Sequence, residues 1–277
     1  MIIASKKETF RILKEYNLIA KKGYGQNFLI NHETILKIAN GAEIDDNTLV
    51  IEIGPGLGAL TQTLLEISKK VIAIEIDKNM VKVLSDNLDC KNLEIINEDF
   101  LKIDLNELIE NNKEFEKVVI VSNLPYYITS DILEKIISAQ NKKIVRVVAM
   151  MQKEVGKKLV KKEEKIESYL KVLIDNFCSV NIVCYVGKND FEPRPNVDSI
   201  VLNFLLNDNK YSLDENYFFM LKECLKNKRK SIINNLPINK ELAIEKLESI
   251  NIKPMIRIEE LNILEFKKIV EELGKWN

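Results

Sequence analysis

Residues 49–58 read Leu-Val-Ile-Glu-Ile-Gly-Pro-Gly-Leu-Gly, an apolar run followed by glycines at alternate positions. The run predicts a buried strand, and the glycines predict a tight turn that lets a ligand approach the backbone closely. Leu60, Leu64 and Leu65 recur at helical spacing, so a helix is expected directly after the turn. The stretch therefore predicts the first strand, turn and helix of an α/β fold.

The chain continues with the same alternation of apolar runs and helical patterns. Further strands are expected at residues 70–76, 93–97, 118–122 and 145–151, and a later one at 199–205. Nearly continuous apolar strands separated by helices are typical of a parallel sheet that is covered on both faces. Such sheets bind ligands at the carboxyl ends of their strands, which is where this sequence places its unusual residues.

A polar stretch at residues 207–210 separates the α/β pattern from a purely helical one. The helical pattern is interrupted at Pro237 and Pro254, as expected because proline ends or kinks helices. We therefore expect an α/β domain over residues 1–206 and a small all-helical domain over residues 207–277.

The composition narrows the class of protein. The chain has 277 residues, of which 46% are hydrophobic and 30% charged, so it can form a real core and is neither a disulfide scaffold nor a collagen-like repeat. With 41 basic and 42 acidic residues the net charge is -1, and a nucleic-acid partner would have to bind local basic patches. The densest short cluster is Lys228-Arg229-Lys230.

Targeting and metal-binding signals are missing from the sequence. The sequence shows no secretory signal. It also has no apolar run of the ~20 residues that a membrane span needs, so we expect a cytoplasmic protein without a membrane partner. The chain has one histidine, and its four cysteines form no Cys-x-x-Cys pair, so no metal is expected.

The glycine turn admits more than one cofactor. Gly54, Gly56 and Ala59 also match the G-x-G-x-x-A fingerprint of dinucleotide-binding folds, so the turn alone does not separate a dehydrogenase from a methyltransferase. Glu75 ends the next strand about 20 residues beyond Gly54, where a carboxylate accepts hydrogen bonds from ribose hydroxyls. That role suits either cofactor.

Asp99 and Phe100 follow the third strand. The acid could accept a hydrogen bond from an adenine amino group, and the aromatic ring could pack on the base. Asp99 could equally serve as the N-cap of the helical stretch that follows it.

The segment Asn123-Leu124-Pro125-Tyr126-Tyr127 ends the fourth strand and is the most informative one. The exocyclic amine of a purine is a poor nucleophile, because its lone pair is delocalised into the ring. An amide oxygen and a backbone carbonyl that accept its N–H bonds would turn the lone pair toward an electrophilic methyl group. Pro125 stiffens the turn, and Tyr126 offers a stacking face for an extruded base.

Two more segments have open interpretations. In residues 191–199 (FEPRPNVDS), Phe191 could sandwich the target base against Tyr126 or could be a core phenylalanine of a proline-braced loop. Residues 21–29 (KKGYGQNFL) have the glycines, the amide side chains and the apolar Phe28 of a flap that closes over a cofactor.

Together these segments resemble the ribosomal RNA adenine N6,N6-dimethyltransferases, the KsgA-type enzymes that modify two adjacent adenosines near the 3′ end of small-subunit rRNA. The resemblance extends over most of the chain, through residues 25–29 (GQNFL), 52–61 (EIGPGLGALT), 74–77 (IEID), 98–100 (EDF), 123–129 (NLPYYIT), 152–155 (QKEV), 191–199 (FEPRPNVDS) and 228–236 (KRKSIINNL).

The resemblance implies a Rossmann-like class I S-adenosylmethionine-dependent methyltransferase sheet. Its helical carboxyl domain would dock on small-subunit rRNA in the immature 30S subunit, with Lys228, Arg229 and Lys230 as phosphate contacts. We expect a monomer. The target adenine would be held by Asn123, Leu124, Pro125, Tyr126 and Phe191. The cofactor would be bound by Gln26, Asn27, Leu29, Gly54, Gly56, Glu75, Ile76, Asp99, Phe100 and Asn123.

Other interpretations fit parts of the sequence. Residues 130–133 (SDIL) are similar to the erythromycin-resistance methyltransferases, which modify an adenosine of large-subunit (23S) rRNA. An NAD-dependent dehydrogenase would share the glycine turn and Glu75 but leaves residues 123–127 unexplained. A non-enzymatic assembly factor predicts the loss of Asn123 or Tyr126, and both are present.

The sequence departs from the family pattern at particular positions. Asp131 stands where the family commonly has proline, Ser168 stands where glycine is usual, and the net charge is lower than is common in the family. Residues 54–58 and 228–236 nevertheless favour the small-subunit enzymes over the large-subunit ones.

Overall fold

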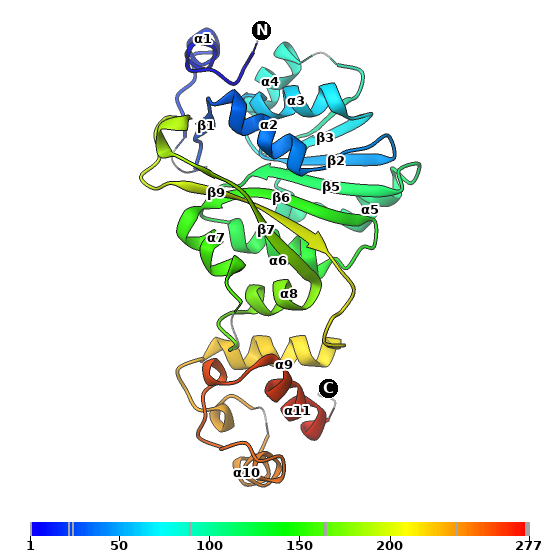
Figure 1. The fold of residues 1–277 in the computed structure, drawn as a ribbon, viewed down its shortest axis with the longest axis vertical. Helices are drawn as coiled ribbons and strands as arrows, with labels where there is room; N and C mark the ends of the chain where they lie inside the picture. Colours follow the sequence, from blue (N-terminus) through cyan, green and yellow to red (C-terminus); the bar gives the residue numbers. More distant parts are fainter. Residues whose placement is uncertain are drawn as a thin grey trace. The chain divides into compact units, whose positions relative to one another are not determined.

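The computed structural model describes residues 2–21, 23, 25–88, 90–162, 165–236 and 238–274. The chain divides into two compact units, the first formed by residues 1–160 and 179–206 and the second by residues 161–178 and 207–277 (Figure 1). The ends of the expected domains at residues 1 and 277 lie outside the described residues, as does Pro237, where we expected a helix break.

The division of the chain differs from our expectation of one uninterrupted domain over residues 1–206. Residues 161–178 belong to the helical unit instead. The reason is aromatic packing within that unit: Phe177 of α8 (Tyr169–Phe177) stacks on Phe218 of α9 (Glu215–Lys226) with ring centroids 5.8 Å apart. Sequence periodicity gives no sign of this contact between distant segments.

The first unit is built on a sheet with the strand order β4-β3-β2-β5-β6-β9-β7 (Figure 1). The strands from β4 to β6 run parallel to their neighbours, which confirms the parallel sheet expected from the apolar runs. Strand β9 instead pairs antiparallel with β6. The strands of this part of the sheet are β2 (Thr48–Ile53), β3 (Lys70–Ile74), β4 (Leu93–Ile96), β5 (Lys117–Asn123), β6 (Ile144–Gln152) and β9 (Ser199–Leu206).

Strand β7 (Cys178–Val186) forms the edge of the sheet beside β9 and was not expected from the sequence. Most of its residues are half-buried or exposed, so it lacks the continuous apolar run by which the buried strands were recognised. A second, very short sheet joins β1 (Phe28–Leu29) antiparallel to β8 (Phe191–Glu192) and ties the flap segment to the FEPRP loop.

Helices of the first unit pack on the sheet through apolar faces. In one core cluster, α2 and α3 contribute Ile35, Ile38 and Leu64 beside Val50 and Val119 of the strands. The helices are α1 (Lys6–Glu15), α2 (His32–Gly41), α3 (Ala59–Ile67), α4 (Lys78–Asn87), α5 (Leu105–Glu110), α6 (Thr129–Ser138) and α7 (Lys153–Val160), with short 3₁₀ turns η2 (Phe100–Lys102) and η3 (Lys188–Asp190).

The second unit is helical throughout its described regular structure, as expected. Besides α8 and α9 it contains α10 (Lys240–Ser249), α11 (Ile263–Leu273) and the 3₁₀ turns η4 (Ile232–Asn234) and η5 (Ile258–Glu260). The ring of Tyr217 packs edge-on against that of Phe266, with centroids 5.2 Å apart, and anchors its core. No helix in the described part of the chain is long and apolar enough to cross a membrane.

The two substitutions in the family pattern have different local settings. Ser168 is the N-cap of α8, and its side chain accepts a hydrogen bond from the backbone N–H of Lys171. A glycine would lack this cap, so the serine stabilises the helix start. Asp131 lies exposed in the first turn of α6, where a negative charge is favourable near the positive end of the helix dipole.

Candidate active site

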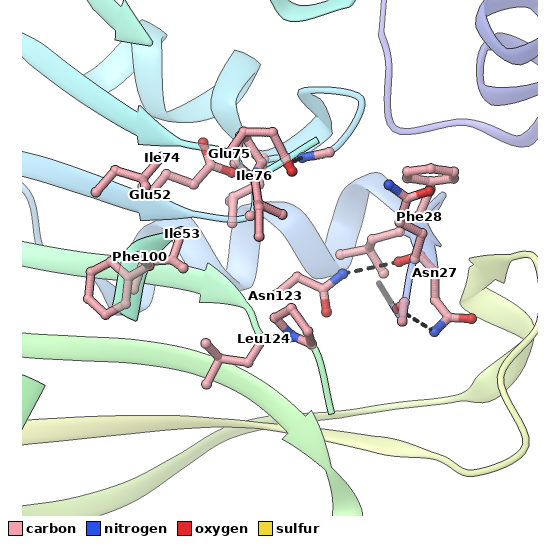
Figure 2. A pocket seen from close by; sticks show the side chains of 18 of the residues that line it. Asn27, Phe28, Glu52, Ile53, Ile74, Glu75, Ile76, Phe100, Asn123 and Leu124 are labelled. Atoms are coloured by element: carbon pink, nitrogen blue, oxygen red, sulfur yellow. Dashed lines mark hydrogen bonds between the residues drawn. The ribbon is translucent and has the colours of Figure 1, made fainter. Parts of the chain in front are cut away.

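A cavity opens at the carboxyl ends of β2, β3 and β5, and its walls come from segments that are far apart in the sequence (Figure 2). It brings together all the residues expected to bind the cofactor: Gln26, Asn27, Leu29, Gly54, Gly56, Glu75, Ile76, Asp99, Phe100 and Asn123. Among those expected to hold the base, it is lined by Asn123, Leu124, Pro125 and Tyr126, but not by Phe191. Their chemical roles remain predictions.

The glycine turn lines the cavity, and its backbone has a conformation in which residues other than glycine would be strained. Gly54 and Gly56 have φ angles of 66° and 58°, in the left-handed region that favours glycine. A Cβ on Gly54 would meet no atom within 4 Å, so the turn leaves open space for a ligand. A Cβ on Gly56 would lie 3.3 Å from the ring of Phe28, which covers the turn.

Glu75 is held rigidly beside this turn. Its Oε2 accepts from the backbone N–H of Gly56 at 3.1 Å, and its Oε1 accepts from that of Asp77 at 2.9 Å. The carboxyl is buried, and this burial raises its pKa above the usual range of a glutamate. Each oxygen can accept a further bond, so the carboxylate can still receive ribose hydroxyls.

Glu52 also lines the cavity and was not selected as a site residue from the sequence. Its side chain is buried, and Oε2 has no hydrogen-bond partner among the described residues. Burial raises its pKa to about 8, and the charge of Glu75 acts in the same direction. The sequence signal that could have identified Glu52 is an acid inside an otherwise apolar strand. Burying a carboxyl oxygen without a partner costs free energy, so such an acid indicates a ligand site.

Asp99 fits both interpretations of its position. Its Oδ1 accepts from the backbone N–H of Leu101 at 2.9 Å and caps η2. The cap uses one carboxylate oxygen, so the other is available to a ligand in the cavity. Beside it, Phe100 is 5% exposed and presents its ring at the cavity wall.

The side chain of Asn123 has a fixed orientation. Its Nδ2 donates to the backbone carbonyl of Asn27 over 3.2 Å (Figure 2). The backbone N–H of Leu124 donates to the carbonyl of Met150 at 3.1 Å. Neither Asn123 Oδ1 nor the Leu124 carbonyl oxygen accepts a hydrogen bond from any residue that the structure describes. Two acceptors on consecutive residues are therefore available beside the cavity.

The turn that follows is closed by its own residues. The carbonyl of Pro125 accepts from the backbone N–H of Ile128 and from the hydroxyl of Thr129, both at 3.2 Å. Tyr126 lines the cavity, and its hydroxyl lies 2.7 Å from Ser199 Oγ. Burial raises the pKa of this phenol, so it stays neutral at physiological pH.

Phe191 lies in the hydrophobic core. It is 2% exposed, pairs with Leu29 in the short β1–β8 sheet and shares a core cluster with Leu29 and Ile35. This placement corresponds to the core-phenylalanine alternative left open from the sequence. Its contact with a target base stays a prediction.

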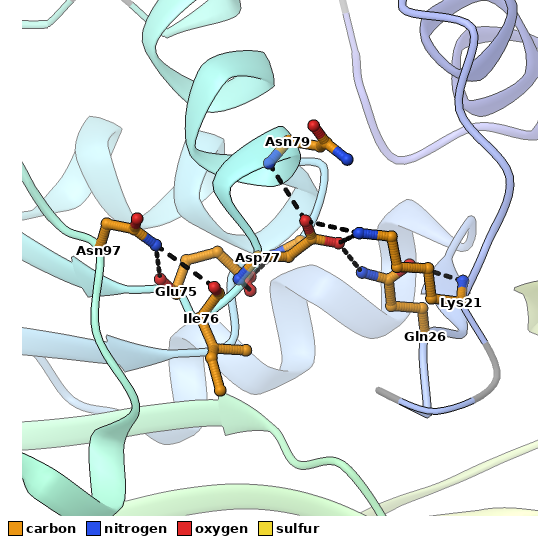
Figure 3. A network of polar contacts seen from close by, with 8 residues as sticks. Lys21, Gln26, Glu75, Ile76, Asp77, Asn79 and Asn97 are labelled. Atoms are coloured by element: carbon orange, nitrogen blue, oxygen red, sulfur yellow. Dashed lines mark hydrogen bonds and ion pairs between the residues drawn. The ribbon is translucent and has the colours of Figure 1, made fainter.

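A polar network anchors the flap segment to the sheet (Figure 3). Asp77 accepts from Lys21 Nζ at 2.9 Å and from Gln26 Nε2 at 3.0 Å, and also caps α4 through the N–H of Asn79. Desolvation alone would raise the pKa of this buried carboxyl, but the bonds from Lys21, Asn79 and Gln26 lower it. The amide of Gln26 thus holds the flap in place.

The predicted RNA contacts belong to the second unit. Lys228, Arg229 and Lys230 are exposed and follow the end of α9. No group of three or more His, Cys, Asp or Glu side chains in the described ranges could hold a metal ion.

Comparison with known proteins identifies the relatives of this chain. Residues 17–275 match the family described as "Ribosomal RNA adenine dimethylase". The "Ribosomal RNA small subunit methyltransferase A" of Staphylococcus aureus is 38% identical over 99% of this chain and 96% of its own length. Among solved structures, a dimethyladenosine transferase from Plasmodium falciparum is 26% identical with a TM-score of 0.71, over 89% of this chain and 97% of that one. The 23S rRNA methyltransferase ErmE shares the fold, at 24% identity and a TM-score of 0.63, over 89% and 99%.

Proposed function

Because this chain belongs to the ribosomal RNA adenine dimethylase family, we propose that it transfers methyl groups from S-adenosylmethionine to N6 of two adjacent adenosines near the 3′ end of small-subunit (16S) rRNA. The substrate is the rRNA of the immature 30S subunit, and the enzyme acts as a monomer. The name of the Staphylococcus aureus relative supports the choice of small-subunit rRNA.

The alternative interpretations have less support. Likeness to the 23S rRNA methyltransferase concerns the fold alone, because identity is 24%. A dehydrogenase would not belong to this family. A non-enzymatic assembly factor has no need of the two unpaired acceptors at Asn123 and Leu124.

Those acceptors are the observation that carries the proposal. Asn123 Oδ1 and the Leu124 carbonyl receive no bond from the described residues, while the amide nitrogen of Asn123 is occupied by Asn27. The exocyclic amine of adenine has two N–H bonds, and accepting both would localise its lone pair. Because both acceptors are fixed before the substrate arrives, the orientation of the amine costs little at the moment of transfer.

The cavity fits S-adenosylmethionine by the hydrogen-bond acceptors that line it. The open space beside Gly54 would receive part of the cofactor. Glu75 would accept from its ribose hydroxyls, and Asp99 with Phe100 would hold its adenine. Glu52 Oε2, which has no partner among the described residues, is a further polar atom in the cavity lining for a ligand to use. When bound, S-adenosylmethionine supplies a sulfonium methyl that is reactive enough to need no general base.

The remaining roles follow from position. Tyr126 provides a stacking face for a base that has left the helix, and Pro125 keeps the Leu124 carbonyl in place. Residues 1–160 and 179–206 form the catalytic domain, and residues 207–277 of the helical unit dock on the rRNA, with Lys228, Arg229 and Lys230 in contact with phosphates.

The test uses immature small subunits from cells that lack this gene. Purified enzyme and S-adenosylmethionine are added, and methylated adenosines are mapped by mass spectrometry of rRNA fragments. We expect N6,N6-dimethyladenosine at two adjacent positions near the 3′ end of 16S rRNA. Methylation confined to 23S rRNA, or none on either rRNA, would overturn the proposal. Calorimetry with S-adenosylmethionine and with NAD should detect binding of the former only.

A further inference from the structure

Tyr126 and Ser199 are joined by a contact that the proposed reaction does not itself require. The phenol oxygen of Tyr126 lies 2.7 Å from Ser199 Oγ, a hydrogen-bond distance. Ser199 is fully buried, and it belongs to the FEPRPNVDS segment, whose last residues have so far no assigned role. We propose that Ser199 is a positioning residue that fixes the direction of the Tyr126 side chain, and so the place of its ring, for stacking on the target adenine. The inference rests on the proposed function.

The contact acts where it constrains the ring most. The backbone turn at Pro125 places the Cα of Tyr126, but it leaves the side-chain dihedral angles free to change. The hydroxyl oxygen is the side-chain atom farthest from Cα and lies on the axis of χ2, so a bond there restricts χ1 and fixes the direction in which the ring points. A stacking face must be in place before the base arrives, because a ring that samples several positions loses part of the stacking energy.

The partner is itself immobile. Ser199 is the first residue of β9 and lies opposite Gln152 at the end of β6 in the antiparallel ladder. The backbone carbonyl of the preceding residue, Asp198, accepts from the backbone N–H of Lys153 at 3.0 Å. Ser199 is thus held by the sheet and not by a loop.

Strand β6, which pairs with β9 beside Ser199, also positions the Leu124 segment that carries one of the two amine acceptors. The Met150 carbonyl on β6 accepts from the N–H of Leu124, and Met150 pairs with Val201 of β9. Strand β6 thereby supports the amine acceptors directly and the Tyr126 ring through Ser199. We therefore expect the target base to meet the acceptors and the Tyr126 ring in one fixed geometry.

The test is a double-mutant cycle in the full-length enzyme, with Ser199→Ala, Tyr126→Phe and the double variant. Tyr126→Phe keeps the ring and removes only the hydroxyl. Methyl transfer to immature small subunits is measured at saturating S-adenosylmethionine. We expect each single variant to lower kcat about 10-fold, because the Tyr126 ring loses its fixed position, and the double variant to be no slower than either. KM for subunits and affinity for S-adenosylmethionine should change less than about two-fold.

A matched control removes a buried hydroxyl elsewhere in the sheet. Thr48 is buried at the amino end of β2, away from the cavity residues, and its hydroxyl donates to Asp45 at 2.6 Å. Thr48→Val should lower the melting temperature without changing kcat. If Ser199→Ala behaves like this control, or if the two single effects multiply in the double variant, Ser199 does not act through Tyr126.

The proposed function is tested separately by Asn123→Ala. If that variant stays active, the assignment of the acceptors fails. If it is inactive while Ser199→Ala keeps its full kcat, only the inference on Ser199 fails.

Discussion

The side-chain amide of Asn123 donates to the backbone carbonyl of Asn27 over 3.2 Å, although 96 positions separate the two residues. This bond determines which atom of the amide faces the cavity. The amide nitrogen of Asn123 is bonded to the flap segment, and the amide oxygen remains available for the substrate. A residue expected to bind the cofactor therefore also orients the residue expected to hold the base.

Replacing Asn123 with alanine tests the acceptor directly. We expect Asn123→Ala to lower kcat by at least about 100-fold, the range found when one transition-state hydrogen-bonding group is removed. S-adenosylmethionine binding should remain measurable by calorimetry, because the other cavity residues are intact. Asn111→Ala, on a surface turn after α5, serves as the control and should keep wild-type kcat. A wild-type rate in Asn123→Ala would contradict the proposed role.

Replacing Asn123 with aspartate tests why the acceptor is neutral. A carboxylate cannot donate to the Asn27 carbonyl and would be repelled by it across the same 3.2 Å. We therefore expect Asn123→Asp to lose its fixed orientation and to release monomethyladenosine, because the bulkier monomethylated amine must be turned for a second transfer. Mass spectrometry of the product gives the ratio of one to two methyl groups. A variant that yields only dimethyladenosine would refute this explanation.

The carboxyl of Glu52 should make stability depend on pH. Its folded-state pKa of about 8 lies above that of an unfolded glutamate, which is about 4.3. Between these values the unfolded chain is ionised while the folded chain keeps its proton, so stability falls as pH rises through this window. The loss is complete above pH 8 and absent below pH 4.

Glu52→Gln removes this dependence, since the amide is neutral at every pH. In thermal unfolding without ligand, the variant should gain stability over the wild type as pH rises from 5 to 8.5, by on the order of a few kcal/mol. Glu66→Gln, at an exposed position of α3, is the matched control and should show no such trend. A difference between Glu52→Gln and wild type that stays constant with pH would show that the carboxyl is ionised in the folded state.

The basic cluster after α9 should contribute to rRNA affinity through salt-sensitive contacts. Changing Lys228, Arg229 and Lys230 to glutamine should weaken binding to small subunits and reduce the slope of log K against log salt by roughly 2 to 3, at just under one unit per phosphate contact. Changing three other exposed lysines, Lys91, Lys113 and Lys142, is the control for net charge. Equal slopes in the two triple variants would exclude a specific role of the cluster.

Much of the fold is determined by local sequence. The strand at residues 48–53 follows from its apolar, β-branched run, and the turn after it follows from glycines at positive φ. The parallel order of the neighbouring strands follows from the helices between them, since short connections cannot join parallel strands. The positions of the site residues could be predicted in the same way, because parallel strands bring their carboxyl ends to one edge of the sheet.

What only the tertiary structure decided are relations between distant segments. The edge strand β7 is too exposed to have an apolar pattern, and α8 joins the helical unit through the contact of Phe177 with Phe218. Phe191 is a core residue because β8 pairs with β1. The orientation of Asn123, the unpartnered Oε2 of Glu52 and the bond between Tyr126 and Ser199 each depend on which atoms meet after folding. Periodicity and propensity act over a few residues, whereas hydrogen-bond partners and burial are properties of the packed chain.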